Sequence, residues 1–197
     1  MTTQYTLHYF DMRARGEIIR LIFNFAGVPY TDNKVPFECW DDFKSNHELP
    51  FNQLPVLEFE GRTLAQSLNG NDNVEKAYLD QIVGGVEDLY IRLLPIIYLE
   101  RDEKSKKEKL DKFFIEVYPS WLMAFQKLLG KYENGQKFLL GSKFSWADLA
   151  LFEIIDLCLD IRSTSLLGFP ALEGYHHRVS MRPELAKYLE TRKPKEV

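Results

Sequence analysis

A polar pair, Gln66-Ser67, stands where chemistry could occur in this sequence. It follows a predicted hairpin made of the strand Val56 to Glu60, a turn around Gly61, and a short second strand, Thr63 to Ala65. At the exit from such a hairpin, where a helix is expected to begin, amide and hydroxyl side chains offer hydrogen-bond donors and acceptors. The function of the chain therefore depends on this junction.

Other residues that could carry chemistry have simpler interpretations. His176 and His177 are adjacent, so they point to different faces of a helix and do not form a metal pair. The basic run 104–109 is interrupted by an acid and preceded by three others, which favours a solvated helix start over a binding patch. Cys39 and Cys158 fit a reduced protein better than a disulfide scaffold. We therefore expect no metal and no disulfide.

Composition narrows the class of protein. The chain has 197 residues, is 45% hydrophobic and 27% charged, and has a net charge of −4. These values are typical of a globular protein and argue against a nucleic-acid binder. The N-terminus lacks the pattern of a signal peptide, and no apolar run is long enough to span a membrane, so we expect a cytoplasmic protein without membrane partners. The 14% aromatic content is compatible with either a thick core or an aromatic-lined pocket.

The first part of the chain alternates strand and helix patterns. Tyr5 to Phe10 is predicted to be a strand, and from Arg13 to a C-cap at Gly27 the apolar residues recur at helical spacing. A weak strand, 30–35, and a loop with a short helix, 36–52, lead to the hairpin. This order predicts an α/β domain of thioredoxin type over residues 1–72.

The second part is predicted to be entirely helical. An apolar stripe runs from Val74 to Ile97, and after the charged run 100–109 a second helix extends to Leu128, with a kink expected at Pro119. Ser145 and Asp148 form a predicted capping box, which starts a buried helix and carries no chemistry. Two short helices should follow the prolines at 170 and 183. We therefore predict an all-helical domain over residues 73–197.

Four segments together resemble the cytosolic glutathione transferases, and most nearly their sigma class, which includes nematode members and glutathione-dependent prostaglandin D synthase. The likeness extends over nearly the full length. The four segments, in order, are Tyr9-Phe10-Asp11-Met12-Arg13-Ala14-Arg15-Gly16-Glu17-Ile18-Ile19-Arg20, Leu54-Pro55-Val56-Leu57, Gln66-Ser67 and Ser145-Trp146-Ala147-Asp148.

This resemblance implies a glutathione-binding thioredoxin-like domain, a helical domain that supplies a site for a hydrophobic electrophile, and a homodimer. Glutathione would be the co-substrate. Pro55 matches the family's cis-proline, whose neighbouring backbone pairs with the cysteinyl part of glutathione.

The resemblance also assigns a catalytic role to Tyr9. A thiol of pKa about 8.5 is only a few per cent ionised near pH 7, and lowering that pKa by about two units requires roughly 2.7 kcal/mol of preferential thiolate stabilisation. Tyr9 lies at the end of the first strand and just before the first helix, where its hydroxyl could donate to the sulfur. The alternative, a core tyrosine, stays open.

Further residues are assigned to glutathione by the same likeness. Arg15 would steady the sulfur site, although a solvated arginine in the first helical turn is an equal alternative. Trp40 and Lys44 would bind the glycine end of glutathione, and Lys44 would pair with the carboxylate of that glycine. Gln53 and Leu54 would contact the tripeptide through backbone and side chain.

The remaining assignments concern the γ-glutamyl end of glutathione. Gln66 and Ser67 would grip this end, with Ser67 using its hydroxyl and the amides of a helix N-terminus. Asp88 would reach across a dimer interface to the partner's glutathione amine, or it is simply an exposed helix carboxylate. Gly84 replaces the first of three acids that bind a divalent cation in the prostaglandin synthase, which argues against metal activation.

One segment departs from the family. The helix that should follow Ser67 is missing, because Leu68 passes directly into five turn-forming residues, Asn69 to Asn73. Its loss would remove the dipole behind Ser67 and expose apolar surface, so we expect weakened glutathione affinity.

The sequence thus predicts a transferase that conjugates the glutathione thiolate to small hydrophobic electrophiles, as in detoxification. Two alternatives remain open: isomerisation of a prostaglandin endoperoxide, and non-catalytic binding of hydrophobic ligands or a structural role. Retained Tyr9 favours an enzyme, whereas the lost helix favours a binder.

Overall fold

The computed structural model describes residues 4–47, 49, 52–59 and 72–192, and the chain divides into two compact units, 1–64 and 65–197.

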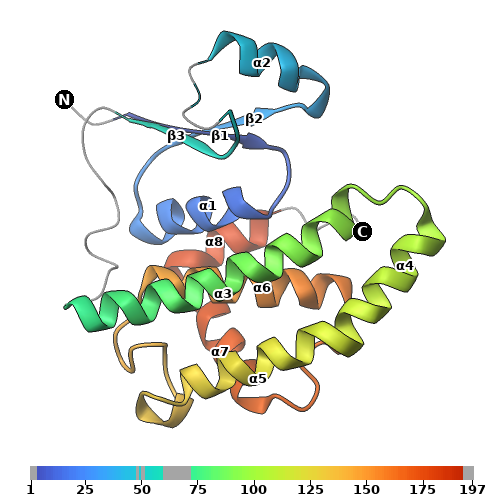
Figure 1. Cartoon of the computed structure of the whole chain (residues 1–197). Helices are drawn as coiled ribbons and strands as arrows, with labels where there is room; N and C mark the ends of the chain where they lie inside the picture. The colour runs from blue at the N-terminus through green and yellow to red at the C-terminus, as the bar shows by residue number, and fades with distance from the viewer. Residues whose placement is uncertain (1–3, 48, 50–51, 60–71, 193–197) are drawn as a thin grey trace. The chain divides into compact units, whose positions relative to one another are not determined.

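The N-terminal unit is built on a small mixed sheet (Figure 1). Its strands are β1 (Tyr5–Phe10), β2 (Thr31–Val35) and β3 (Val56–Phe59), in the order β2-β1-β3. β1 runs parallel to β2 and antiparallel to β3. Helix α1 (Arg15–Ala26) covers one face of the sheet and α2 (Trp40–Asn46), preceded by the 3-10 turn η1 (Phe37–Cys39), lies over the other. The thioredoxin-like α/β arrangement predicted from the sequence is confirmed for these elements.

Local sequence explains the ends of α1. Several of its apolar side chains, including Ile18 and Leu21, are buried. Gly27 ends the helix in the left-handed conformation, with φ 62° and ψ 25°, and its amide donates to the carbonyls of Asn24 and Phe23. The predicted C-cap at Gly27 is therefore confirmed.

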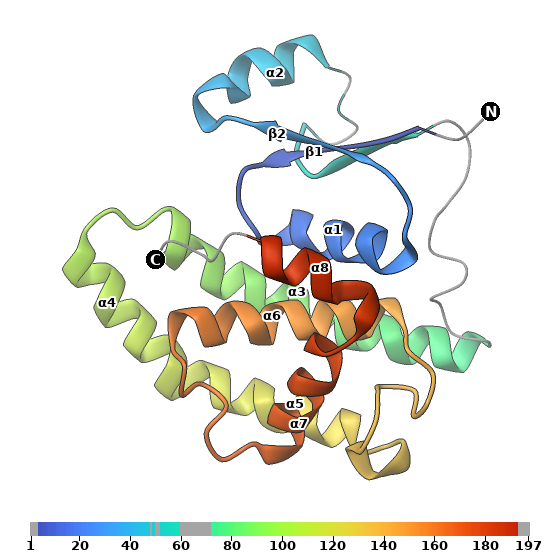
Figure 2. The same ribbon diagram turned by 180° about the vertical axis from the view of Figure 1, so that it is seen from behind.

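The C-terminal unit is helical, as predicted (Figure 2). Its elements are α3 (Asn73–Tyr98), α4 (Glu103–Lys112), the π-helical turn η3 (Phe113–Val117), α5 (Tyr118–Leu129), the 3-10 turn η4 (Glu133–Gly135), α6 (Trp146–Ile161), α7 (Pro170–Ser180) and α8 (Pro183–Thr191). Helix α6 is buried on nearly every face and packs against α3 and α7, so it forms the centre of this unit's core.

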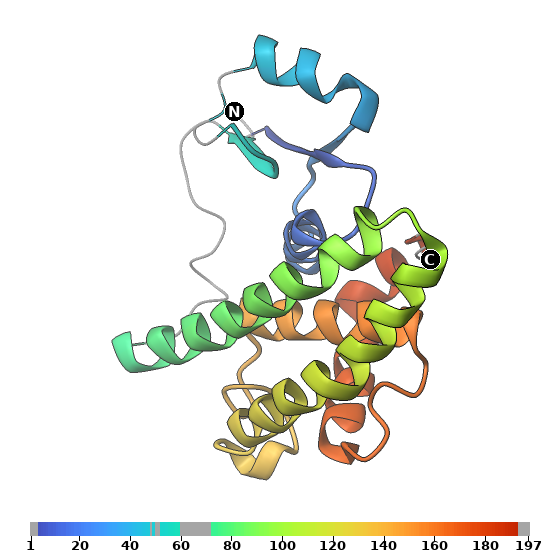
Figure 3. The same ribbon diagram turned by 45° about the vertical axis from the view of Figure 1, so that its right-hand side comes forward.

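Two features of this unit differ in detail from what the sequence predicted. The second long helix begins at Glu103, inside the charged run, because Asp102 caps it through Oδ1, which accepts from the Ser105 amide at 2.7 Å. Near Pro119 the chain forms the π-helical turn η3 before α5, with the Tyr118 amide donating to the carbonyl of Phe113. Figure 3 shows α4 and α5 continuing one another through this turn.

The capping box at the start of α6 is a hub of hydrogen bonds. Asp148 is fully buried, and its carboxylate accepts from the Ser145 amide at 2.8 Å, the Ser145 hydroxyl at 2.7 Å, the Leu139 amide at 2.9 Å and the Tyr175 hydroxyl at 3.2 Å. Burial nevertheless outweighs these bonds and raises the pKa of Asp148 to about 6. The predicted start of α6 is thus confirmed.

The junction after β3 falls mainly outside the described residues. The predicted turn at Gly61, the strand Thr63 to Ala65 and the missing helix after Leu68 all lie there. What is described is the start of α3, where the Asp72 carboxylate accepts from the amides of Val74 and Glu75 at 2.8 Å each. No helix in the described part of the chain is long and apolar enough to cross a membrane.

Candidate functional site

Tyr9 lies at the end of β1 with its ring packed against the start of α1. The side chain is 5% exposed, and a Cβ built on Gly16 would stand 2.3 Å from Tyr9 Cδ1. The guanidinium carbon of Arg20 lies 5.8 Å from the centre of the Tyr9 ring. The absence of a side chain at Gly16 thus lets the first turn of α1 approach the tyrosine closely.

Pro55 reaches the same end of the sheet through strand pairing. Val56 pairs with His8 in the antiparallel register of β1 and β3, so Pro55, one residue before Val56, and Tyr9, one residue after His8, stand at the next register position. The Leu54–Pro55 peptide bond is cis, as the likeness to the transferases implied. Gln53, which precedes Leu54, is exposed.

Trp40 and Lys44 lie together on α2, one helical turn apart. The Lys44 Nζ atom is 6.0 Å from the centre of the Trp40 ring, and Lys44 is exposed. Phe10 of β1 contacts the Trp40 ring edge-on at 5.7 Å between ring centres and stacks on the exposed Phe37 at 4.3 Å. An aromatic surface therefore links the end of β1 to the helix that carries Lys44.

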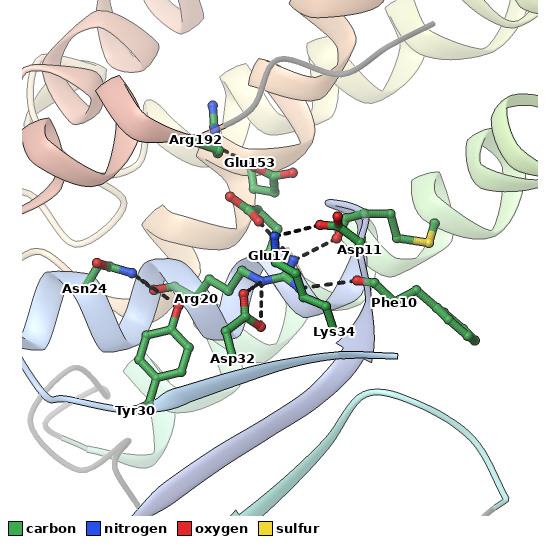
Figure 4. Close-up of polar contacts among 11 residues, drawn as sticks. Phe10, Asp11, Glu17, Arg20, Asn24, Tyr30, Asp32, Lys34, Glu153 and Arg192 are labelled. Carbon is green, nitrogen blue, oxygen red and sulfur yellow. Dashed lines mark hydrogen bonds and ion pairs between the residues drawn. The ribbon is translucent and has the colours of Figure 1, made fainter. Parts of the chain in front are cut away.

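Arg20 holds the turn after Tyr9 in place (Figure 4). This buried side chain donates from Nη1 to the Met12 carbonyl at 2.7 Å and from Nη2 to the Phe10 carbonyl at 3.3 Å. Its Nε lies 3.0 Å from Asp32 Oδ2, and its Nη1 lies 3.3 Å from Glu17 Oε2, a carboxylate that is itself buried. One guanidinium thus joins β1, the turn, α1 and β2.

No role was predicted from the sequence for Arg20 or for Gly16. A signal for Arg20 was available, since an arginine on a helix that is otherwise apolar on its inner face, three residues after an acid, suits a buried ion pair. The closeness of Gly16 to Tyr9 had no such signal, because it depends on how α1 packs on the sheet.

The segment that leads into α1 contains an unusual backbone conformation. Ala14, immediately before the helix, is fully buried and has φ 60° and ψ −141°, a region that glycine adopts far more readily than alanine. Arg15 follows as the first residue of α1 and is half-buried. The sequence offered no warning of this strain.

Nearby electrostatics stabilise the strand-to-helix packing without adding a reactive group. Burial raises the pKa of Tyr30 to about 12, assisted by the Asp32 carboxylate. The Lys34 Nζ atom lies 2.7 Å from Asp11 Oδ1 at the end of the strand (Figure 4). Tyr30 therefore stays protonated near neutral pH and serves packing.

The remaining predicted site residues are those assigned to the γ-glutamyl end of glutathione. Gln66 and Ser67 lie outside the described residues, and Asp88 is an exposed residue of α3 in the helical unit. In that same unit the fully buried carboxylate of Glu153 pairs with Arg192 at 3.3 Å, a contact that ties the end of α8 to α6 (Figure 4).

The described residues of the helical unit also line surface hollows, of which two are considered. One, of about 280 Å³, lies between α4 and the end of α6; the other, of about 350 Å³, lies at the end of α3. The second is lined by Pro95, Ile96, Leu99, Glu100 and Lys109. Within the described ranges, no group of three or more His, Cys, Asp or Glu side chains could hold a metal ion.

Comparison with known proteins gives matches along most of the chain. The family model for the glutathione S-transferase N-terminal domain matches residues 5–71, and that for the C-terminal domain matches residues 87–192. A relative named glutathione S-transferase P, from Caenorhabditis elegans, is 31% identical over 94% of this chain and 92% of its own length.

Solved structures give the same result. The Pi-class glutathione S-transferase of Onchocerca volvulus is 31% identical with a TM-score of 0.85, over 98% of this chain and 94% of the other. Rat hPGDS, solved with a quinoline, is 26% identical with a TM-score of 0.84, over 98% and 100% of the two chains. A Necator americanus enzyme, Na-GST-3, described as monomeric, is 26% identical with a TM-score of 0.84, over 98% and 100%.

The two family models fall in both units, and the Caenorhabditis elegans relative matches nearly end to end at 31% identity. The chain therefore belongs to the glutathione S-transferase family.

Proposed function

We propose that this chain is a glutathione transferase that conjugates the thiolate of glutathione to small hydrophobic electrophiles. The observation that carries the proposal is the placement of Tyr9 and Pro55 one residue beyond the His8–Val56 pair of the sheet, with Tyr9 beside the start of α1. A donor hydroxyl, a cis-proline backbone and a helix N-terminus then converge on the place where the family binds the cysteinyl sulfur.

In this mechanism Tyr9 donates a hydrogen bond to the sulfur and favours its ionised form. Lowering a thiol pKa by about two units corresponds to about 2.7 kcal/mol, which is within reach of a charge-assisted hydrogen bond aided by a helix N-terminus. Arg15, the first residue of α1, steadies the same charge. The thiolate then attacks the electrophile, and the leaving group takes the bonding electrons.

The rest of the tripeptide binds along the N-terminal unit. Lys44, with Trp40 beside it, binds the glycine carboxylate, and Gln53 with the Leu54–Pro55 backbone binds the cysteinyl part. At the γ-glutamyl end, Gln66 and Ser67 of the same chain and Asp88 of a second copy complete the site.

Several finer assignments belong to this proposal. We place the domain boundary at residues 72 and 73, the chain in the sigma class, and the enzyme in the cytoplasm as a homodimer engaged in detoxification. The likeness to hPGDS supports the sigma class, whereas the Pi-class match and the monomeric Na-GST-3 are the competing precedents. Gel filtration with light scattering decides between dimer and monomer.

The hollow at the end of α3 suits the apolar end of an electrophile. Pro95, Ile96 and Leu99 supply its apolar lining, and Leu99 is 73% exposed. We therefore expect Leu99→Asp to raise the KM for the electrophile while leaving the KM for glutathione unchanged.

A conjugation assay with a chromogenic dinitrobenzene tests the function. Tyr9→Phe should lower kcat/KM by about tenfold to a hundredfold, because each unit of thiol pKa changes the thiolate population near pH 7 by about tenfold. Tyr5→Phe, at the other end of the same strand, is the matched control and should retain activity. Equal activity of wild type and Tyr9→Phe would show that the Tyr9 hydroxyl does not stabilise the thiolate.

Calorimetric titration of glutathione separates an enzyme from a non-catalytic binder. Because we expect no helix behind Ser67, the dissociation constant for glutathione should be larger than that of a relative which retains that helix. The same preparation assayed with a prostaglandin endoperoxide tests the isomerase alternative, which the likeness to hPGDS favours.

A further inference from the structure

The sheet face beneath α2 carries a buried histidine that the proposed mechanism does not use. His8 precedes Tyr9 on β1, so the two side chains point to opposite faces of the sheet. Tyr9 packs on the α1 side, against Gly16, whereas His8 is 6% exposed and packs under α2. A buried imidazole needs partners for its two ring nitrogens.

Both neighbouring strands place polar side chains beside these nitrogens. Asn33 of β2 lies directly beside His8 in the strand register, with its Nδ2 atom 2.7 Å from His8 Nδ1. Because an amide nitrogen can only donate, Nδ1 accepts, and the proton of the neutral ring is on Nε2. That nitrogen lies 3.2 Å from Glu58 Oε2 on β3, within ion-pair distance but without the geometry of a hydrogen bond. The ring is therefore held by a hydrogen bond from β2 and lies beside a carboxylate on β3.

Helix α2 rests on this fixed ring through two aromatic side chains. The centre of the Phe43 ring is 5.4 Å from that of His8, and the His47 ring is 5.9 Å away. Phe43 and His47 stack on each other at 3.8 Å with an interplanar angle of 13°, and His47 Nδ1 lies 2.9 Å from the Phe43 carbonyl. The C-terminal end of α2 thus packs against the His8 ring.

The contact continues to the residues proposed to bind glutathione. Phe43 stacks on Trp40 at 6.4 Å between ring centres, and Lys44 lies over the other end of the same aromatic layer, 6.0 Å from the centre of the Trp40 ring. Phe10 touches Trp40 directly. Two residues of β1 that face α2, His8 and Phe10, therefore set the position of Trp40. Of these two, His8 is the one held by a polar side chain, that of Asn33.

We propose that His8 is a positioning residue for the glycine end of the glutathione site. By seating α2 on the sheet through Phe43, it places Trp40 and Lys44 where they meet the glycine carboxylate. This inference rests on the proposed function. Because Tyr9 faces the other side of the sheet, loss of His8 affects glutathione binding and spares the chemical step.

Steady-state kinetics at saturating electrophile test this role. His8→Ala should raise the KM for glutathione about fivefold or more, the effect expected from losing a positioning contact of about 1 kcal/mol, with kcat within about twofold of wild type. His8→Phe keeps an aromatic platform without its anchors and should recover part of the loss. His177→Ala, an exposed histidine of α7, is the control and should leave both constants unchanged.

Asn33→Ala keeps the test decisive if His8→Ala does not fold. It removes one anchor while leaving the ring, so the KM for glutathione should rise in the same direction by a smaller factor. A folded His8→Ala or Asn33→Ala variant with unchanged KM, or with kcat reduced instead of KM raised, overturns the inference.

Failure of the proposed function gives a different result from failure of the inference. If the wild-type chain neither binds glutathione in the calorimeter nor conjugates it, the proposed function is wrong and the role of His8 with it. If the wild type binds and conjugates normally while His8→Ala has the same KM, only the role of His8 is wrong.

Discussion

Gly16 lies against the ring of Tyr9 so closely that a Cβ built on Gly16 would stand 2.3 Å from Tyr9 Cδ1 and 2.6 Å from Cγ. Protein atoms do not approach this closely, so any side chain at position 16 must push the tyrosine ring or lift the start of α1. The location of the proposed catalytic hydroxyl therefore depends on a residue that cannot itself take part in the chemistry.

Gly16→Ala should lower kcat/KM for glutathione conjugation at least tenfold, because a shift of about 1 Å in a catalytic group can cost a hundredfold. Alanine is favoured over glycine within a helix by about 1 kcal/mol, so any loss of stability should be partly offset. Conjugation kinetics and urea unfolding of the same variant measure both effects.

Gly84→Ala is the matched control, since a Cβ at this exposed position of α3 meets nothing within 4 Å. It should preserve activity and slightly stabilise the protein. If Gly16→Ala were as active as Gly84→Ala, the position of the Tyr9 ring would not limit the reaction.

Ala14→Gly should stabilise the chain by about 1 kcal/mol. Ala14 is held at φ 60° and ψ −141°, where a Cβ costs of order 1–3 kcal/mol, and glycine removes that cost at the expense of some unfolded-state entropy. Urea unfolding gives the free energy directly. A lower midpoint for the glycine variant would show that the alanine methyl contributes more through packing than its backbone conformation costs.

The strands and most helix starts were predictable from sequence because their signals are local. Tyr5 to Phe10 is a strand, Gly27 is a left-handed cap, and Ser145 with Asp148 marks the start of α6, as the structure confirms. The charged run 100–109 was predicted to interrupt the apolar stripe and to contain a solvated helix start. The structure confirms that helix start, since Asp102 caps a helix in which Lys and Glu are good helix formers.

The geometry around Tyr9 was much less predictable, because it is set by packing between elements. In the sequence Arg20 is one more residue of a predicted helix. In the structure its guanidinium donates to the carbonyls of Phe10 and Met12, at the end of β1 and in the turn that follows. Ala14 runs against local preference, since propensity alone places glycine at such a φ. Likewise, His8 reads as one residue of an alternating strand, and only the register brings Asn33 beside it.

Arg20→Ala should destabilise the N-terminal unit by about 3 kcal/mol or more. The substitution leaves the carboxylate of Glu17, which is 1% exposed, without this guanidinium, and frees the carbonyls of Phe10 and Met12. Conjugating activity should fall as well, because the turn after Tyr9 loses its anchor. Chemical unfolding and kinetics at low temperature, where the variant stays folded, measure the two effects.

An exposed ion pair provides the comparison for Arg20. Lys112 lies 3.9 Å from Glu116 on the surface, and Lys112→Ala should change the free energy of unfolding by no more than about 0.5 kcal/mol. Comparable losses in the two variants would mean that Arg20 contributes only as a surface charge does.

Asp148 should make the helical unit less stable as the pH rises from 4 to 7. Its pKa is raised from 3.8 to about 6 in the folded chain, so the folded state binds the proton more tightly than the unfolded state. Its contribution to stability is therefore greatest below pH 4 and is lost as the pH rises through 6. The full change is about 3 kcal/mol, from roughly 1.4 kcal/mol per pKa unit.

Comparison with Asp148→Asn isolates this effect, because other titrating groups remain in both proteins. Among them is Glu100, whose pKa is lowered to about 2, chiefly by the hydrogen bond from Lys109. The asparagine variant should be less stable at every pH, because its amide nitrogen cannot accept the donated hydrogen bonds. The difference in unfolding free energy, wild type minus variant, should shrink between pH 4 and 7. A difference that stays flat or grows with pH would mean that the four donors, and not burial, set the protonation of Asp148.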